Sequence, residues 1–393
     1  MKHSIKTSLL ALLSAGLLNG CDLIENDDDP KLPATALVQT VATDYSSSGV
    51  VAIDIENQQV TSGYYVKDKS DYRIDSHLNN VYHIGRRNID TISKYSSDNL
   101  DSLVWTFSTQ DNEDTTSRNP YTITFAHESK AYLIRYASDK VWIVNPEATQ
   151  AEDFKIGELD LSSYLEEDFG GTPNPSAAIV HEDKLYIAMQ RLDTNWSAHT
   201  TYVAVFDVNT NEEIETNANS EDAVKGIPLS GFNPLENSLT AFGDEVFVTT
   251  RDKFILPNLD VSKVEAVNVG DYSVREVINA NDIGAPILSS VIINDEQGYF
   301  ITNPAGYNES GAWVETGSLF EFNPTTGEII EEGVANTGSE DINFMTLDEN
   351  NYLWLSIGSA QTPGVEVLDT RDNTRYSERL LTDLNPGKIV FLK

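Results

Sequence analysis

The string Leu185-Tyr186-Ile187-Ala188 decides the fold, because versions of it recur along the chain. Each version is a short apolar strand rich in aromatic residues, and it follows another apolar strand and a polar turn. The other versions are Val81-Tyr82-His83-Ile84, Ala131-Tyr132-Leu133-Ile134, Val246-Phe247-Val248-Thr249, Tyr299-Phe300-Ile301-Thr302 and Tyr352-Leu353-Trp354-Leu355. Recurrence of one strand–turn–strand unit predicts a repeat protein made of small sheets.

Asn-Pro pairs accompany these units, at Asn119-Pro120, Asn174-Pro175, Asn233-Pro234 and Asn385-Pro386. Proline has no N–H to donate, so within a sheet it belongs at an edge or at the first residue of a strand. We therefore expect each pair to open the first strand of a unit. The first three pairs are 55 and 59 residues apart, a spacing that fits propeller blades with long loops.

The turns between later strands indicate four strands in each unit. Third strands such as Val203-Ala204-Val205-Phe206-Asp207 end in an acid or amide, and turns such as Pro324-Thr325-Thr326-Gly327 lead into a fourth strand. Asx side chains and glycine favour tight hairpin turns. Four antiparallel strands form the blade of a β-propeller. The sequence therefore predicts an all-β fold, a seven-bladed propeller of four-stranded antiparallel blades.

The seventh blade must be assembled from both chain ends. Six blades are recognised directly, within residues 71–108, 118–161, 174–229, 232–278, 286–334 and 341–381. Residues 385–391 resemble an opening strand with nothing after it, and residues 43–66 resemble strands two to four. Pairing of these N- and C-terminal strands would close the ring and remove exposed sheet edges. Six or eight blades stay as alternatives, because residues 253–269 alternate poorly.

The N-terminal segment has the features of a lipoprotein export signal. Lys2 and Lys6 precede an apolar run that is too short to span a bilayer, and Leu18-Asn19-Gly20-Cys21 resembles the lipobox of bacterial lipoproteins. Cys21 is the single cysteine, so it has no disulfide partner. We expect residues 1–20 to be the signal peptide, residues 21–36 a lipidated acidic tether and residues 37–393 the propeller. An ordinary cleaved signal is the alternative.

Charge limits the partners that the protein can bind. The chain carries 62 acidic against 26 basic residues, a formal net charge of −36. Nucleic acids and anionic lipid head groups are bound through basic patches, so both are excluded as partners. The expected location is the bacterial cell envelope, at the outer membrane or cell surface. The outer leaflet of the inner membrane is the alternative, because Asp22 resembles a retention signal.

The strings Lys130-Ala131-Tyr132-Leu133-Ile134-Arg135-Tyr136 and Asn119-Pro120-Tyr121 resemble seven-bladed YVTN-type propellers of bacterial surface lipoproteins. The resemblance covers nearly all of the mature chain. It also implies an architecture similar to that of cell-surface cobalamin-binding propellers, which pair with TonB-dependent transporters. No ligand motif of those proteins is shared, so the resemblance names no cofactor and no binding residue.

Catalytic and metal motifs are missing from the sequence. Turns such as His127-Glu128-Ser129-Lys130 and His181-Glu182-Asp183-Lys184 repeat between blades and lack the ligand spacing of calcium loops. A Gly-x-Ser-x-Gly elbow and a recognisable triad are also lacking. We expect neither a metal site nor catalysis, although a propeller enzyme of the lyase or lactonase type could gather its residues from separate blades.

Arginines recur where the second strands end, at Arg86, Arg135, Arg191 and Arg251. In a propeller these exits surround the central funnel. A cluster of guanidinium groups would bind carboxylate or phosphate through forked hydrogen bonds. The alternative is that each arginine pairs with an acidic residue of a neighbouring blade.

Two of the exit loops are long and carry aromatic residues. Trp196 and His199 lie in the first, and Tyr307 and Trp313 in the second. Exposed loop aromatics are candidates for ligand binding, or each loop packs on its own blade. We expect a lipid-anchored ligand-binding propeller that captures a scarce nutrient or cofactor for an outer-membrane transporter. A protein-interaction scaffold of the envelope is the first alternative.

Overall fold

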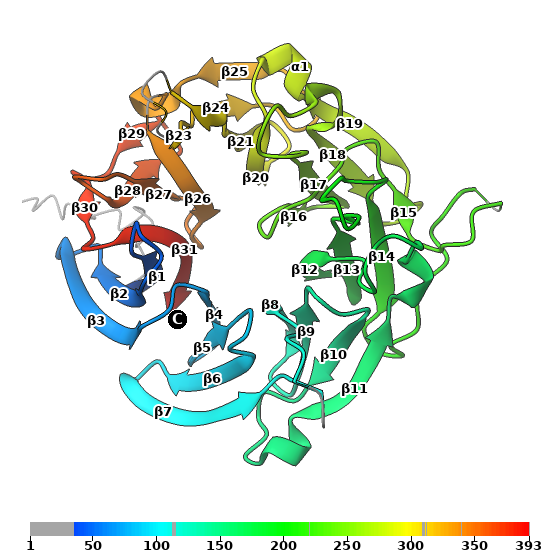
Figure 1. Cartoon of the computed structure of the whole chain (residues 1–393). Coiled ribbons are helices and arrows are strands. Elements are labelled where there is room, and N and C mark those ends of the chain that lie inside the picture. The colour runs from blue at the N-terminus through cyan, green and yellow to red at the C-terminus, as the bar shows by residue number, and fades with distance from the viewer. Residues whose placement is uncertain are drawn as a thin grey trace, which may run out of the picture. The chain divides into compact units, whose positions relative to one another are not determined.

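The structure is a ring of seven antiparallel sheets around a central axis (Figure 1). This computed structural model describes residues 35–111, 115–219, 221–308, 311, 313–338 and 340–392. The prediction of an all-β seven-bladed propeller is confirmed. Every blade has four main strands, and the innermost strand of each one faces the axis.

The strands of the first three blades, from the axis outward, are as follows. Blade 1 has β31 (Asn385–Leu392), β1 (Thr35–Val41), β2 (Ser48–Asp54) and β3 (Gln59–Lys67). Blade 2 has β4 (Tyr72–His77), β5 (Asn80–Gly85), β6 (Thr91–Ser96) and β7 (Asn99–Ser108). Blade 3 has β8 (Pro120–His127), β9 (Lys130–Arg135), β10 (Lys140–Val144) and β11 (Lys155–Asp160).

The other four blades complete the ring. Blade 4 has β12 (Pro175–His181), β13 (Lys184–Met189), β14 (Tyr202–Asp207) and β15 (Ile227–Pro228). Blade 5 has β16 (Leu239–Phe242), β17 (Glu245–Thr250), β18 (Lys263–Asn268) and β19 (Val274–Asn279). Blade 6 has β20 (Ile287–Asn294), β21 (Gln297–Thr302), β24 (Leu319–Phe322) and β25 (Ile329–Glu332). Blade 7 has β26 (Asp341–Leu347), β27 (Leu353–Gly358), β28 (Gly364–Asp369) and β29 (Thr374–Arg375), with β30 (Leu380–Leu381) beside β28.

Helical structure is confined to single turns between strands. They are α1 (Ala280–Ile283) and the 3-10 turns η1 (Ala151–Asp153), η2 (Ser162–Tyr164), η3 (Leu259–Val261) and η4 (Val334–Asn336). Within the described residues, no helix is both long and apolar enough to cross a membrane.

Both ends of the described chain meet in blade 1, as predicted. Strand β31 is innermost and pairs antiparallel with β1, with Ala36 opposite Phe391 and Val41 opposite Asn385. The predicted bounds were wrong at one point, because the second strand is residues 35–41 and lies before the expected start at residue 43. Since β1 and β31 share a ladder, the inner edge of β1 is paired.

Apolar layers between neighbouring blades form the core. The middle residues of the second strands are almost completely buried, among them Tyr132, Tyr186 and Tyr299. Two of these tyrosines also reach a turn of the next blade, where the hydroxyl donates to an asparagine Oδ1. The distance is 3.2 Å from Tyr132 to Asn211 and 2.6 Å from Tyr299 to Asn373. The recurring aromatic residue therefore joins blades through both apolar area and a hydrogen bond.

Three of the four Asn-Pro pairs lie where a first strand begins. Proline 120 opens β8, Pro175 opens β12, and Pro386 is the second residue of β31. In blade 5 the expectation was wrong, because Asn233-Pro234 precedes a loop and β16 begins only at Leu239. The asparagines preceding the first three prolines adopt positive φ angles of 50°, 55° and 62°. Asparagine tolerates this left-handed region better than most residues.

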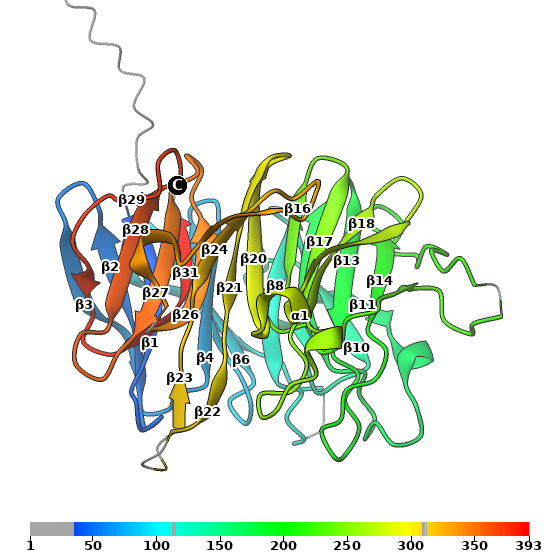
Figure 2. The same ribbon diagram turned by 90° about the horizontal axis from the view of Figure 1, so that it is seen from above.

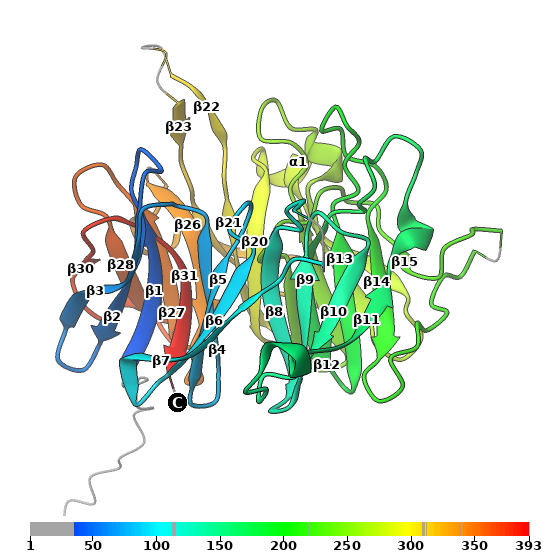
Figure 3. The same cartoon turned by 60° about the horizontal axis from the view of Figure 1, so that its bottom comes forward.

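The two faces of the ring carry different features. We call the face where the second strands end the exit face. The hairpin of β22 (Ala305–Tyr307) and β23 (Trp313–Glu315) projects from it (Figure 3). The side view shows the end of β31 on the opposite face, and the β1–β31 register places Thr35 beside Leu392 there (Figure 2).

Candidate functional site

Two adjoining cavities open on the exit face around the axis. The first, the aromatic cavity, has a volume of about 570 Å³, and its wall includes Tyr121, Tyr136, Trp196 and Phe254. The second, the acidic cavity, has a volume of about 680 Å³ and lies toward blades 1 and 7. Both are lined by Arg73, Glu236, Asn237, Glu315 and Asn343, so they form one continuous funnel.

The aromatic wall is assembled from several blades. Tyr121 and Tyr136 stack with ring centroids 4.9 Å apart, and the Tyr136 hydroxyl donates to Gln190 Oε1 at 2.6 Å. Trp196, in the loop between β13 and β14, lines the same cavity, and 69% of its surface is exposed. Flat apolar faces on more than one side of a cavity suit a ligand that contains a ring.

Amide side chains supply the polar groups of this cavity. Gln190, Asn233, Asn237, Asn303 and Asn343 all contribute to its lining. Each primary amide offers both donors and an acceptor, so neutral polar groups of a ligand could be bound from several directions. This combination of aromatic rings and amides is typical of a binding pocket.

Glu236 forms the floor of the funnel by reaching across the axis. It lies in the loop before β16 of blade 5, yet its Oε2 accepts hydrogen bonds from Arg73 Nε at 3.1 Å and Arg86 Nη1 at 3.0 Å, both from blade 2. Burial opposes ionisation of this carboxyl, but the two guanidinium groups outweigh it and lower the pKa of Glu236. The floor is therefore a charged clamp between blades that are not neighbours in the ring.

A smaller channel of about 260 Å³ continues along the axis below this floor. Glu236 and Asn237 line it from above, and an ion pair between Asp75 of β4 and Lys388 of β31 lies in its wall. Burial raises the pKa of Asp75, although Lys388 acts in the opposite direction. The ion pair links the blade closed by the C-terminal strand to the blade after it.

The acidic cavity contains a carboxyl group that is poorly solvated. Asp341 Oδ1 is buried and has no hydrogen-bond partner among the described residues. Burial, with a smaller contribution from the Glu315 carboxylate, raises the pKa of Asp341 to about 7. Glu315 itself is engaged, because its Oε1 accepts a hydrogen bond from Trp313 Nε1 at 2.8 Å. A buried carboxyl group with such a raised pKa can exchange a proton near neutral pH.

The four predicted arginines lie beneath the funnel and do not line either cavity. All are buried and engaged with protein groups. Their guanidinium partners are Glu236 and Asp71 for Arg86, Asp111 for Arg135, Glu166 for Arg191, and the carbonyl oxygen and Oδ1 of Asn303 for Arg251. Three of the arginines pair with acidic residues and Arg251 pairs with an asparagine. Anion binding by these arginines stays a prediction.

The four predicted loop aromatics do not share one site: two line the funnel cavities and two do not. Trp196 lines the aromatic cavity and Trp313 lines the acidic one. Tyr307 is 70% exposed and packs edge-on against Trp313, with centroids 5.2 Å apart, but it lines neither cavity. His199 points away from the lining into a separate group of side chains.

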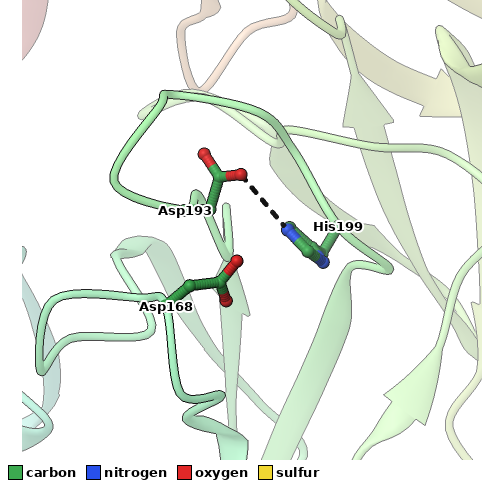
Figure 4. Close-up of side chains that lie close together, drawn as sticks. All are labelled: Asp168, Asp193 and His199. Carbon is green, nitrogen blue, oxygen red and sulfur yellow. Dashed lines mark ion pairs between the residues drawn. The ribbon is translucent and has the colours of Figure 1, made fainter.

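That separate group joins His199 to Asp168 and Asp193 (Figure 4). One ligand atom from each residue lies within 4.8 Å of the others. Asp168 comes from the segment before β12, and the other two residues come from the loop between β13 and β14. The sequence did not suggest this group, because its members are 25 and 6 residues apart and match no known ligand spacing.

The sequence also gave no sign of Arg73, Glu236, Phe254 or Asp341 as funnel residues. None of them lies in a recurring motif, and each reaches the funnel through the bend of its own loop or strand end. A search for polar residues at or just before the starts of the first strands would have found Arg73 and Glu236, because those strand starts surround the axis. Cys21 lies outside the described residues.

Comparisons with known structures agree with the fold. Neither protein-family models nor curated protein sequences give a match. A solved structure from Lactobacillus plantarum is similar over 92% of this chain and 100% of its own, at 10% identity and a TM-score of 0.57. A candidate 6-phosphogluconolactonase from Bacteroides fragilis is similar over 93% of this chain and 100% of its own, at 12% identity and a TM-score of 0.54. Apo AztD from Citrobacter koseri is similar over 91% of this chain and 98% of its own, at 12% identity and a TM-score of 0.51. Likeness at these identities shows the propeller fold alone.

Proposed function

We propose that this protein is a ligand-binding propeller whose aromatic cavity takes a small molecule with a ring. One observation carries the proposal: stacked Tyr121 and Tyr136 line the same cavity as exposed Trp196, together with five amide side chains. Ligand pockets of soluble proteins combine apolar walls with a few polar groups that fix orientation. A volume of about 570 Å³ accommodates a molecule of vitamin or nucleoside size.

The charge of the lining favours a neutral or zwitterionic ligand. Arg73 and Lys253 are balanced by Glu236 and Glu315 around the aromatic cavity. In the adjoining acidic cavity, carboxylates outnumber cations. A polyanionic ligand would meet repulsion there, so this proposal departs from the anionic ligand that the exit arginines suggested.

The proposed role in the cell is capture of a scarce nutrient or cofactor for an outer-membrane transporter of the TonB-dependent class. The lipobox-like Cys21 supports a lipid anchor. The position of Thr35 is compatible with the capture role. Thr35 lies at the face opposite the cavities, so an anchor attached on its N-terminal side would not need to cover them. The funnel mouth would then stay open to ligand and partner.

Ligand-induced stabilisation tests the binding proposal. A panel of ring-bearing nutrients and cofactors should contain a compound that raises the melting temperature and changes tryptophan fluorescence. At about 100 times its dissociation constant, it should stabilise the fold by roughly 2.7 kcal/mol. Trp196→Ala should abolish the shift, whereas Tyr307→Ala should retain it, since Tyr307 is equally exposed on the same face but lines neither cavity. Equal loss in both variants would contradict binding in the aromatic cavity.

A second candidate function rests on Asp341. A carboxyl group whose pKa is raised to about 7 has the properties of a general acid or base. The protein would then be a hydrolase or lyase acting in the acidic cavity. Activity on a lactone or ester panel that rises with pH near 7 and disappears in Asp341→Asn would favour catalysis over capture.

A further inference from the structure

Asp168, Asp193 and His199 form a compact group outside the funnel, on loops of the exit face (Figure 4). The two loops are joined by a backbone hydrogen bond from Thr194 N to Asp168 O at 2.9 Å. Because of this bond, the Asp168 carboxylate stays near the other two side chains. Three potential ligand atoms therefore come together from segments held by the main chain.

Asp193 is prepared to act as a ligand. Its Oδ1 accepts hydrogen bonds from the backbone N–H of Asn195 at 2.7 Å and of Ser197 at 2.9 Å. Its Oδ2 faces His199 Nε2 at 3.8 Å. The loop backbone therefore holds Oδ1 in place, and Oδ2 is left facing the group, where it could bind a metal ion.

A carboxylate also lies near the other ring nitrogen of His199. Its Nδ1 faces Glu166 Oε2 at 3.8 Å, on the opposite side of the ring from Asp193. Glu166 is itself paired with the buried guanidinium of Arg191. In metal-binding histidines a hydrogen bond from this nitrogen to a carboxylate orients the ring, and Glu166 is placed to accept one after a small movement.

We propose that Asp168, Asp193 and His199 bind a divalent transition-metal ion, with Zn²⁺ the best fit. Imidazole nitrogen with carboxylate oxygen suits Zn²⁺, whereas Ca²⁺ and Mg²⁺ prefer oxygen ligands alone. Ligands of tetrahedral Zn²⁺ are about 3.4 Å apart, given bond lengths near 2.1 Å. The 3.8 Å between His199 Nε2 and Asp193 Oδ2 needs little adjustment to reach this spacing.

Metal binding would also fix the position of Trp196. This residue lies between Asp193 and His199 in the chain, and its side chain lines the aromatic cavity. An ion held by both ends of this short loop would limit its motion. The metal site and the aromatic cavity would then be coupled, with Zn²⁺ preorganising one wall.

Calorimetric titration of the full-length, tag-free protein with Zn²⁺ tests the proposal. We expect one Zn²⁺ per chain and affinity for Ca²⁺ and Mg²⁺ at least about 100-fold weaker. Asp193→Asn and His199→Ala should each weaken Zn²⁺ binding by more than about tenfold. His127→Ala is the matched control, because His127 is exposed and lies outside the group; its affinity should be unchanged.

Tryptophan emission provides a second readout. Zn²⁺ should change the emission of the unaltered protein, and Trp196→Phe should remove most of that change while retaining calorimetric binding. Unchanged Zn²⁺ affinity in Asp193→Asn and His199→Ala would overturn the site. Absence of Zn²⁺ binding to the unaltered protein, or equal affinity for Ca²⁺, would overturn it as well.

Discussion

Arg251 shows how a buried cation can shape a binding cavity without touching its ligand. Nη2 donates to the carbonyl oxygen of Asn303 at 2.7 Å and to its Oδ1 at 2.8 Å, and Nη1 donates to the Lys253 carbonyl oxygen at 2.9 Å. The guanidinium also lies 4.0 Å from the ring centroid of Phe254. Since Asn303, Lys253 and Phe254 line the aromatic cavity, Arg251 holds that wall from behind.

Replacing Arg251 should therefore destabilise the protein even without ligand. We expect Arg251→Leu to lower the free energy of unfolding by about 2–4 kcal/mol, because buried acceptors lose their charged donor. Urea unfolding measures the change, and Arg87→Leu at an exposed position should change it by less than about 0.5 kcal/mol. An Arg251→Leu protein as stable as its parent would mean that this arginine is not a brace.

Asp341 should make stability depend on pH. Its pKa is raised to about 7, so between pH 4 and 7 the native state holds a proton that the unfolded chain has released. Stability is lost as pH rises through this interval. Asp341→Asn removes the loss, so the melting temperature of the variant should equal that of the parent near pH 4 and exceed it at pH 8. The gain should be on the order of 1–3 kcal/mol.

A melting-temperature difference between the Asp341→Asn variant and its parent that is constant from pH 4 to 8 would contradict the raised pKa. Asp369→Asn serves as the control, because hydrogen bonds from Arg371 lower the pKa of Asp369. That substitution should cost stability at pH 8 and much less at low pH, which is the opposite dependence.

At this scale the sequence predicted which residues recur but not where they point. The arginines at the second-strand exits were visible as a pattern, yet each side chain turns toward its own set of partners. Glu236 was not predicted, because its partners Arg73 and Arg86 belong to a blade on the far side of the axis. Such a contact depends on the curvature of the whole ring, which no local spacing encodes.

Among the elements, β31 has the largest structural role. It supplies the innermost strand of blade 1, and Lys388 from it pairs with Asp75 in the channel. Deleting residues 385–393 removes this strand and exposes the inner edge of β1. We expect the truncated protein to aggregate or to lose cooperative thermal unfolding, as measured by calorimetry and light scattering.

Removing only Lys393, which lies beyond β31, is the matched control and should leave unfolding cooperative. Unfolding of the longer truncation at the temperature of the intact protein would show that the ring closes by other means.

The strands that were predicted best are those whose burial can be recognised from an apolar run in the local sequence. The second strands of blades 2 to 7 were found because an apolar run buried on both faces needs no knowledge of its neighbours, whereas that of blade 1, β1, was missed. The delayed start of β16 and the hairpin of β22 and β23 were not found. Both features depart from the four-strand repeat. They depend on loops at the exit face whose sequences show no periodic pattern of apolar residues.

At the scale of the whole molecule, the proposed lipid anchor gives a direct prediction. Cys21→Ser removes the thiol that would carry the lipid, so the protein should move from the membrane fraction to the soluble fraction of fractionated cells. Immunoblotting of both fractions measures the change. Asn19→Ser, in the same segment, should leave the protein in membranes. A Cys21→Ser protein that stays membrane-bound after signal cleavage would exclude lipidation as the anchor.

Closure of the ring by β31 also sets the order in which the protein can be completed during its synthesis. Every other described strand leaves the ribosome before β31, and β1 must wait for a partner that follows more than 340 residues later. Until then the first blade lacks its inner strand, and the nascent chain stays open and accessible. An open chain of this kind would suit the proposed export, because the last step of folding cannot occur before β31 has been made.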